Sequence, residues 1–339
     1  MHFARFPRVH FAHLPTPFEP LDRLSKHLAN EAGGGPRLWI KRDDCTGLAT
    51  GGNKTRKLEF LMGDALAQGA DTIITQGATQ SNHARQTAAA AAKLGLACHI
   101  LLQDRTGFTS RDYTRNGNVI LDQLCGAEIH RHGAAADMNV EMEALAKTLR
   151  AQGKKPYVIP GGGSNAVGAL GYAEVAMELV GQANAKDVKI DHVYLATGSA
   201  GTQAGFVVGM AALNSGIPTM GISVKQERTK QEEDVFALAQ KTEAHMGLKG
   251  VIKREHVVAD SGYVGPGYGQ STPGMVEAVR LLASLEGILL DPVYSGKAMA
   301  GLIDHVRQGR FARESDVVFI HTGGSVGIFA YLDTFESNA

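Results

Sequence analysis

The sequence predicts an α/β fold in which mostly parallel sheets carry helices on both faces. Short runs of strand-forming residues alternate with helical patterns along the whole chain. Glycines and prolines stand at the ends of these segments, where chains turn. With 339 residues, 44% of them hydrophobic, the chain can bury a large core as one big domain or two medium ones.

Short apolar runs rich in β-branched or aromatic residues are expected to be strands: residues 38–40, 72–75, 98–102, 157–159, 193–195, 220–223 and 317–320. Helical patterns fill gaps between them, at residues 84–94, 138–152 and 275–286. Strands that alternate with helices imply right-handed crossovers. The glycine clusters Gly51–Gly52 and Gly161–Gly163 are candidate boundaries of a smaller α/β unit inside a larger one. Ligands bind at the carboxyl ends of such strands, so the expected site is the cleft between the units.

Composition points to small-molecule partners. Lys and Arg total 34 and Asp and Glu total 34, so no net charge recruits nucleic acid or a membrane surface. Cys45, Cys98 and Cys125 lie far apart, which indicates neither a disulfide framework nor a zinc site, and no metal is expected. The start of the chain lacks the apolar region of a signal peptide, and no apolar run could span a bilayer. We therefore expect a cytoplasmic protein.

The most informative segment is residues 197–205, Thr-Gly-Ser-Ala-Gly-Thr-Gln-Ala-Gly, which follows the apolar run 192–196. A strand, a glycine-rich turn and a helix in this order direct backbone N–H groups and a helix dipole at one point, which suits a phosphate. The turn has neither the Walker Gly-Lys-Ser/Thr ending nor Gly-x-Gly-x-x-Gly, so a small phosphate ester fits best. Many such turns bind nothing, and this alternative stays open.

A second turn, Gly51-Gly52-Asn53-Lys54, puts a lysine where its amine can reach a cleft. Desolvation or a cationic neighbour lowers the pKa of such an amine and lets it form a Schiff base. The alternative is a solvated surface lysine, and Arg56 and Lys57 fit a surface position equally well.

Further polar turns follow other predicted strands. In residues 76–83, Ser81 and Asn82 could receive a carboxylate, although Ser and Asn also serve as ordinary helix N-caps. Tyr294 follows the apolar run 288–290 and could face a ligand or pack as an aromatic with a wet edge. His321 stands at a strand end and is expected to be structural.

Together these turns resemble the fold-type II pyridoxal-phosphate (PLP) enzymes of the D-cysteine desulfhydrase and 1-aminocyclopropane-1-carboxylate (ACC) deaminase family. The segments that carry the resemblance are residues 51–57, 80–86, 197–202, 262–269 with Tyr263 and Tyr268, and 291–294. The resemblance covers nearly the whole chain. It implies a tryptophan synthase β-like fold with two open twisted sheets, and a homodimer. It also implies a large PLP-binding domain of residues 1–50 and 165–339, a small domain of residues 51–164, and an active site between them.

The resemblance also implies a role for each site residue. Lys54 would hold the coenzyme covalently and later remove the substrate Cα proton, and Asn82 would bond the pyridoxal 3-hydroxyl. The phosphate would be held by the loop Thr197, Gly198, Ser199, Ala200, Gly201 and Thr202. The amino-acid substrate would be bound by Gln80, Ser81, Asn82 and His83 and flanked by Tyr294 and Tyr268. Thr322 would meet the pyridine nitrogen, with Ser295 as a second candidate.

Residues 12–17, 42–50 and 76–80 are most similar to the L-cysteate sulfo-lyase branch of this family. The deaminase branch has a glutamate after the equivalent of Tyr294, where this chain has Ser295. A hydroxyl leaves the pyridine nitrogen largely neutral, which favours β-elimination over ring opening. The sequence therefore predicts a lyase that converts L-cysteate to pyruvate, sulfite and ammonia.

Other readings stay open from the sequence alone. The nearest is a D-cysteine desulfhydrase, which would release hydrogen sulfide with the same apparatus. A sulfonate would require additional cations or donors, and the candidates are His83, Arg85, Lys225 and Arg228. A binding protein without catalysis would not need an amine at Lys54, and a nicotinamide-dependent oxidoreductase would need the missing Gly-x-Gly-x-x-Gly.

Overall fold

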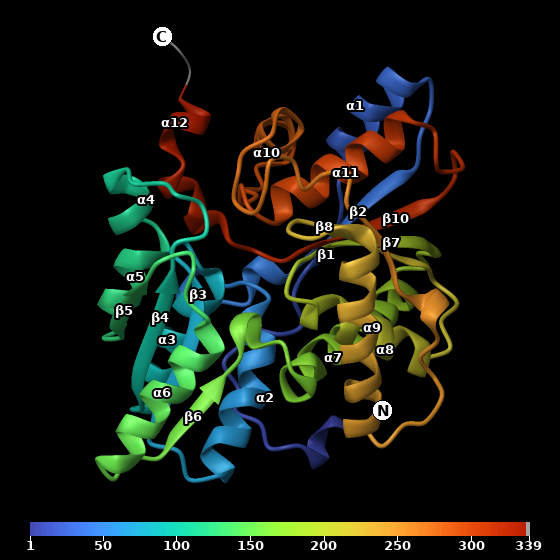
Figure 1. Ribbon diagram of the computed structural model, residues 1–339. Coiled ribbons are helices and arrows are strands. Elements are labelled where there is room, and N and C mark those ends of the chain that lie inside the picture. Colours follow the sequence, from blue (N-terminus) through green and yellow to red (C-terminus); the bar gives the residue numbers. More distant parts are fainter. Residues whose placement is uncertain (337–339) are drawn as a thin grey trace.

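Two separate sheets organise the protein, as seen in a computed structural model that describes residues 1–336 (Figure 1). The larger sheet contains, in spatial order, β1 (Phe18–Pro20), β2 (Arg37–Arg42), β10 (Asp316–His321), β7 (Ile190–Thr197), β8 (Thr219–Ser223) and β9 (Val258–Asp260). The smaller sheet contains β5 (Glu128–His132), β4 (Ala97–Gln103), β3 (Thr72–Ala78) and β6 (Pro156–Ile159). Every pairing is parallel except that of β1 with β2. This confirms the predicted α/β class.

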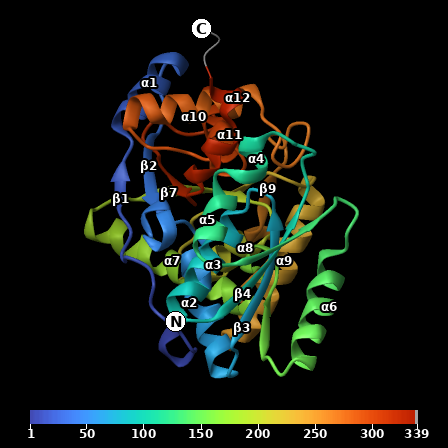
Figure 2. The ribbon, with the colours of Figure 1, turned by 90° about the vertical axis from the view of Figure 1, so that its left-hand side faces the viewer.

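Helices cover both faces of each sheet, as Figures 1 and 2 show. On the larger sheet, alternate residues pack against α7 (Ala166–Ala185) and α8 (Gly201–Ala212) on one face, with α9 (Arg228–His245) beyond α8. The other face packs against α1 (Asp22–Ala32), α10 (Pro273–Glu286) and α11 (Ser295–Arg307). The smaller sheet lies between α6 (Met138–Ala151) and the set α2 (Lys54–Ala67), α3 (Asn82–Leu94) and α5 (Asn118–Leu124). Two short helices, α4 (Arg111–Arg115) and α12 (Leu332–Phe335), complete the α-helices of the described residues.

All of the predicted strand segments lie inside observed strands, and the predicted helices differ from α3, α6 and α10 by at most two residues at an end. Three edge strands were not predicted. β1 and β9 have only three residues each, and β5 reads Glu-Ile-His-Arg-His, with too few apolar residues to show a strand pattern. Among residues 1–336, none of the helices combines the length and the apolar character needed to cross a bilayer.

The strand order supports the proposed division into two domains. All strands of the smaller sheet come from residues 72–159, and the strands of the larger sheet come from residues 18–42 and 190–321. The division of the chain at residues 50 and 164 stays a proposal.

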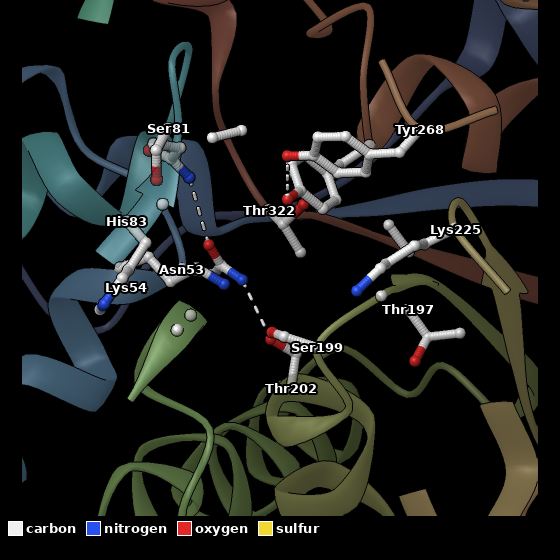
Figure 3. A pocket seen from close by; sticks show the side chains of 18 of the residues that line it. Asn53, Lys54, Ser81, His83, Thr197, Ser199, Thr202, Lys225, Tyr268 and Thr322 are labelled. Carbon is white, nitrogen blue, oxygen red and sulfur yellow. Dashed lines mark hydrogen bonds between the residues drawn. The ribbon is translucent and has the colours of Figure 1, made fainter. Parts of the chain in front are cut away.

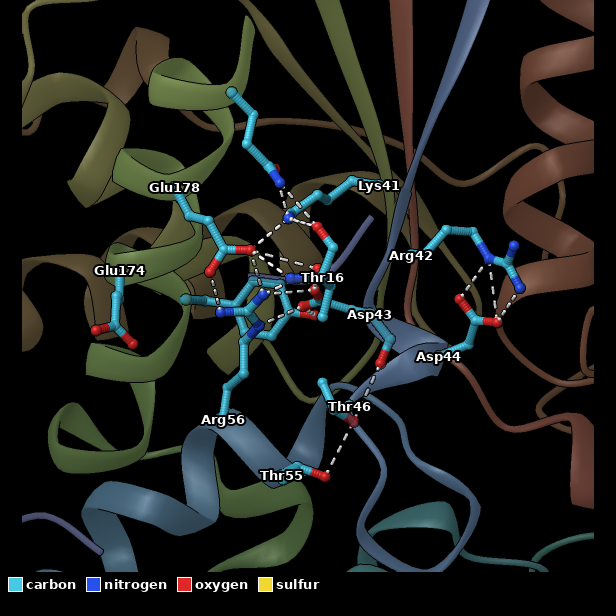
Figure 4. A network of polar contacts seen from close by, with 12 residues as sticks. Thr16, Lys41, Arg42, Asp43, Asp44, Thr46, Thr55, Arg56, Glu174 and Glu178 are labelled. Atoms are coloured by element: carbon cyan, nitrogen blue, oxygen red, sulfur yellow. Dashed lines mark hydrogen bonds and ion pairs between the residues drawn. The ribbon is translucent and has the colours of Figure 1, made fainter. Parts of the chain in front are cut away.

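A buried charge cluster holds the beginning of α2 against the larger sheet (Figure 4). Arg56 is completely buried rather than on the surface, and its guanidinium donates to both oxygens of Asp43 and both oxygens of Glu178, each at 2.9 Å. Lys41 also contacts Glu178 and donates to Thr16 O at 2.7 Å. Buried charges persist only when they are paired in this way. The cluster joins β2, α2 and α7, and so fixes the position of the first turn of α2.

Candidate active site

A cavity of about 200 Å³ lies where the carboxyl ends of strands from both sheets meet (Figure 3). Most of the predicted site residues line it: Lys54, Ser81, Asn82, His83, Thr197, Gly198, Ser199, Ala200, Thr202, Tyr268, Tyr294 and Thr322. Figure 3 shows Lys54, Ser81 and His83 on the side of the smaller sheet and Thr197, Ser199 and Lys225 on the side of the larger one. The structure therefore brings together side chains that are far apart in the sequence.

Lys54 is the first residue of α2. Burial lowers the pKa of its amine to about 8, although a hydrogen bond that Lys54 donates to Lys57 and the charge of Asp291 act in the opposite direction. A lysine with this pKa is neutral for part of the time near pH 7, so it can act as a nucleophile or a base. The position of Lys54 fits an amine that forms a Schiff base.

Lys57 is a fully buried amine near Lys54, a position that was not predicted from the sequence. It lies one turn along α2 from Lys54, its Nζ donates to Gly162 O at 3.2 Å, and a Cβ atom added at Gly201 would lie 3.0 Å from that Nζ. Burial and the charge of Lys54 hold the pKa of Lys57 well below its ordinary value. The i, i+3 spacing from Lys54 was the one signal that could have placed Lys57 beside the glycine loop.

The loop after β7 is shaped to receive an anion. Thr197 ends the strand, Ala200 adopts the left-handed region with φ of 70°, and α8 begins at Gly201. Non-glycine residues at positive φ are sparsely populated and gather at functional sites. The hydroxyls of Ser199 and Thr202 line the cavity at this positive end of a helix, where the N–H of Gly201 already donates to Ser199 O and the next N–H groups can face a ligand. Thr202 is held there because Asn53 Nδ2 donates to its Oγ1 at 3.0 Å.

The amide of Asn82 has a defined orientation. Its Oδ1 accepts from Arg85 Nη2 and from Gln86 Nε2, both at 2.5 Å, while its Nδ2 donates weakly to Asn53 Oδ1 at 3.3 Å. The Nδ2 group therefore keeps donor capacity for a ligand oxygen in the cavity. Arg85 is completely buried behind Asn82 and does not line the cavity. It therefore cannot bind a sulfonate, the role for which the sequence made it a candidate.

Ser81 and Gln80 differ in what they offer the cavity. Ser81 is the N-cap of α3 and accepts from Ala84 N at 3.1 Å, but it also lines the cavity with its own O–H available. Gln80 does not line the cavity. Its Nε2 donates to Tyr113 O at 2.6 Å, and its Oε1 accepts from Asn118 N at 2.9 Å. The expectation that Gln80 binds substrate is corrected, because both ends of its amide are hydrogen bonded to residues 113–118.

Two tyrosines line the part of the cavity that belongs to the larger sheet. Tyr268 and Tyr294 are in hydroxyl contact at 2.7 Å with their rings edge to face. Burial raises the pKa of both phenols, so both stay neutral donors near pH 7. Asp291 fixes Tyr294 by accepting from its backbone N–H at 2.8 Å and also accepts from the Ser295 hydroxyl at 2.6 Å. The hydroxyl of Ser295 is therefore already hydrogen bonded, and Ser295 does not line the cavity, whereas Thr322 does.

His83 presents an acceptor rather than a cation. Thr75 Oγ1 donates to Ile159 O at 2.9 Å, so His83 Nε2 must donate to Thr75 Oγ1 at 2.8 Å. His83 Nδ1 is then unprotonated, and it has no partner among the described residues. Burial, followed by the charges of Lys54 and Lys57, holds the pKa of His83 well below its ordinary value. A neutral acceptor offers no charge to a carboxylate or a sulfonate, so His83, which lines the cavity, could bind only a donor group of the substrate, and its substrate-binding role stays a proposal.

The cavity contains two basic side chains besides Lys54. Lys225 and Arg105 line it, and no Asp or Glu is among the described lining residues. Arg105 donates to Gln76 Oε1 at 2.7 Å, and its guanidinium lies over the Tyr268 ring at 6.0 Å from the centroid. The position of Arg105 at the cavity was not predicted from the sequence, because it lies in a loop after β4 with no motif around it. Arg228, a sequence candidate, pairs with Glu232 instead and is outside the cavity.

The amine, the anion-binding loop and the donor of Asn82 match the aldehyde, phosphate and 3-hydroxyl of pyridoxal phosphate. A family model described as pyridoxal-phosphate dependent enzyme matches residues 9–323. The D-cysteine desulfhydrases of Salmonella typhimurium (strain LT2) and Salmonella typhi are each 48% identical over 330 residues, covering 97% of this chain and 98% of the relatives.

Two solved structures are similar to this chain. A structure described as an ACC deaminase homologue is 38% identical with a TM-score of 0.86, and the match covers 99% of both chains. O-ureido-L-serine synthase is 17% identical with a TM-score of 0.65 over 96% of this chain and 92% of that one, which shows a shared fold. The protein therefore belongs to the pyridoxal-phosphate dependent enzymes, in the fold-type II group of D-cysteine desulfhydrase and ACC deaminase.

Proposed function

We propose that the protein is a β-eliminating carbon–sulfur lyase that converts D-cysteine to pyruvate, hydrogen sulfide and ammonia. The observation that carries the choice of substrate is the 48% identity over 97% of the chain to enzymes named D-cysteine desulfhydrase. The sequence alone favoured L-cysteate as the substrate, whereas the comparisons favour D-cysteine. The cavity supports the reaction class, because it combines an amine of lowered pKa with neutral phenols and free cations.

Each step of the elimination has a residue suited to it. Bound pyridoxal phosphate withdraws electrons from the amino-acid Cα and so makes its proton removable. Lys54 is the base that takes this proton, since its amine is neutral for part of the time near pH 7. The Cβ–S bond then breaks, and Tyr294, hydrogen bonded to Tyr268, donates a hydrogen bond to the departing sulfide. The three-carbon remainder reacts with water to give pyruvate and ammonia.

The remaining residues orient the reactants. Ser81, at the N-terminus of α3, offers a hydroxyl and nearby N–H groups to the substrate carboxylate. The loop of residues 197–202 with Lys57 would hold the phosphate, Asn82 the 3-hydroxyl, and Thr322 the pyridine nitrogen. A hydroxyl partner such as Thr322 leaves that nitrogen largely neutral, which suits elimination.

L-Cysteate stays a second candidate because of one observation. Lys225 and Arg105 line a cavity in which the described residues include no carboxylate, so a second anionic group on the substrate would find cations there. Burial, followed by the charge of Arg105, lowers the pKa of Lys225, and an added sulfonate would offset that lowering.

A side-by-side assay distinguishes the two substrates. We expect the holoenzyme to release sulfide from D-cysteine faster than it releases sulfite from L-cysteate at equal concentration. In Lys225→Met, D-cysteine turnover should change little while any L-cysteate turnover should fall at least tenfold, because only the sulfonate needs the added cation. Faster sulfite release from L-cysteate would assign the protein to the sulfo-lyase branch. If neither compound reacts while the coenzyme is bound, the lyase proposal is wrong.

A cytoplasmic location and a homodimer also stay proposals. The family relationship supports the dimer, and light scattering of the eluting holoenzyme would test it by giving twice the mass of one chain.

A further inference from the structure

Three metal-ligating side chains meet on the smaller sheet, away from the cavity. His99 lies on β4, and Glu128 and His130 lie on the edge strand β5. His99 pairs directly with Glu128 in the parallel register, and His130 follows Glu128 by two residues, so all three side chains point to one face of the sheet. That face also carries Leu101, which packs against α6.

The spacing of the three groups matches a tetrahedral ion. His99 Nδ1 lies 3.2 Å from His130 Nε2 and 3.5 Å from a Glu128 oxygen, and His130 Nε2 lies 3.4 Å from the other Glu128 oxygen. Zinc binds imidazole and carboxylate at about 2.0–2.2 Å, and two ligands at a tetrahedral angle are then roughly 3.3–3.6 Å apart. One ligand atom from each residue lies within 4.8 Å of the others.

The cluster is accessible to an ion from solvent. Side-chain exposure rises from 13% at His99 through 29% at His130 to 65% at Glu128, so the site opens at the edge of the sheet.

We propose that His99, Glu128 and His130 form a binding site for a divalent transition ion of the zinc type, with water as the fourth ligand. Two imidazoles and one carboxylate are a donor set that zinc prefers over magnesium or calcium, which favour oxygen alone. The ion would clamp the exposed edge strand β5 to β4. No sequence spacing revealed this site, because its ligands come from two strands that pair only in the fold.

The simplest alternative needs no metal. The two rings can hydrogen bond to each other as neutral imidazoles, with Glu128 as an exposed ion-pair partner. Zinc affinity distinguishes the two, since a ring pair of this kind would bind the ion no more tightly than any exposed His–Glu pair.

The test is calorimetric titration of chelator-treated holoenzyme with zinc chloride, in the wild type and in His130→Asn and Glu128→Gln. His27→Asn is the matched control, because His27 and Glu31 form an exposed pair at 3.3 Å that offers only two donors. We expect one zinc per chain in the wild type and in His27→Asn. In His130→Asn the affinity should fall at least 10–100-fold, the range that loss of a partner behind a metal ligand costs at established sites.

The three variants should keep the visible absorbance and the turnover of the holoenzyme, because none of these residues lines the cavity. Equal zinc affinity in the wild type and His130→Asn would overturn the proposal. So would a loss in His27→Asn as large as that in His130→Asn.

Discussion

The reactivity of Lys54 comes from its surroundings. The side chain is half-buried near a second, fully buried amine, Lys57, and both pKa values are lowered. Two amines so close together disfavour two positive charges, so one of them is readily neutral. The bound phosphate would then compensate the positive charge of Lys57, whose Nζ lies next to the loop at Gly201.

Tyr294→Phe should lower turnover without loss of the coenzyme. The substitution removes the hydroxyl that Tyr268 contacts at 2.7 Å and leaves the ring in place. A loss of about 10²–10⁴ in kcat is expected if the phenol assists the departure of sulfide. Steady-state kinetics and the visible spectrum are the measurements. The matched control is Tyr194→Phe, which loses a buried hydroxyl contact of 2.8 Å to His305 outside the cavity. Equal kcat values for both variants would remove Tyr294 from the chemistry.

Motif residues of the site were predictable from the sequence, whereas supporting residues were not. Lys54, Ser81 and the loop after β7 stand in glycine-rich or polar turns, and such turns mark strand ends. Lys57 and Arg105 carry charges that would be solvated in most sequences, and only the fold shows them facing the cavity or its loop.

Side-chain partners explain the corrections. Gln80 was expected at the substrate because of its position in a motif, but its partners Tyr113 and Asn118 lie more than 30 residues away along the chain. No local sequence pattern predicts such long-range contacts. The same holds for His83, whose tautomer is set by Ile159 through Thr75.

At the scale of elements, the catalytic turn depends on the anchoring of α2. Arg56 lies two residues after Lys54 and joins α2 to Asp43 and to Glu178 of α7. Burial alone would raise the pKa of Glu178, but Arg56 and Lys41 hold it at about 2.

Glu178→Gln should destabilise the protein by about 3–5 kcal/mol, because it leaves buried cations without their partner. The pKa of Glu178 is lowered in the folded state, so its contribution to stability is complete above about pH 4.5 and is lost as the pH falls towards 2. Denaturant unfolding at several pH values should therefore show a shallower acid loss in the variant than in the wild type.

Glu174→Gln is the control for this prediction. Glu174 lies on the same helix and pairs with Arg8 at 2.6 Å, where Arg8 keeps Glu59 as a second partner. Its replacement should cost less than that of Glu178. If the two variants were equally stable at every pH, the anchoring role of the cluster would be refuted.

The regular elements were predictable because their signals are local. The strand runs of β3, β4 and β10 combine apolar character with clear turn residues at their ends. β5 escaped prediction, since an edge strand with an exposed face needs few apolar residues. The pairing of β1 with β2 is antiparallel and brings together segments about 20 residues apart, which no periodicity encodes.

At the scale of the whole molecule, the coenzyme would join the two sheets. Lys54 and Asn82 lie on elements that pack with the smaller sheet, and the loop of residues 197–202 belongs to the larger one. A ligand held from both sides stabilises their arrangement by mass action.

Removal of the coenzyme should therefore lower the Tm by several degrees, since a ligand at 100 times its Kd adds about 2.7 kcal/mol of stability. Differential scanning calorimetry of the holoenzyme, the apoenzyme and the reconstituted enzyme measures this. The reconstituted sample should recover the holoenzyme value. An apoenzyme with an unchanged Tm would show that the cavity does not hold the coenzyme between the sheets.

Chemical trapping of the coenzyme shows which amine carries it. Borohydride makes the bond between pyridoxal phosphate and a lysine permanent, and peptide mass spectrometry then locates it. We predict a single modified residue, Lys54, and no modification in Lys54→Ala under the same treatment. Modification of Lys57, which is only three residues away and more deeply buried than Lys54, or of neither lysine, would contradict this assignment.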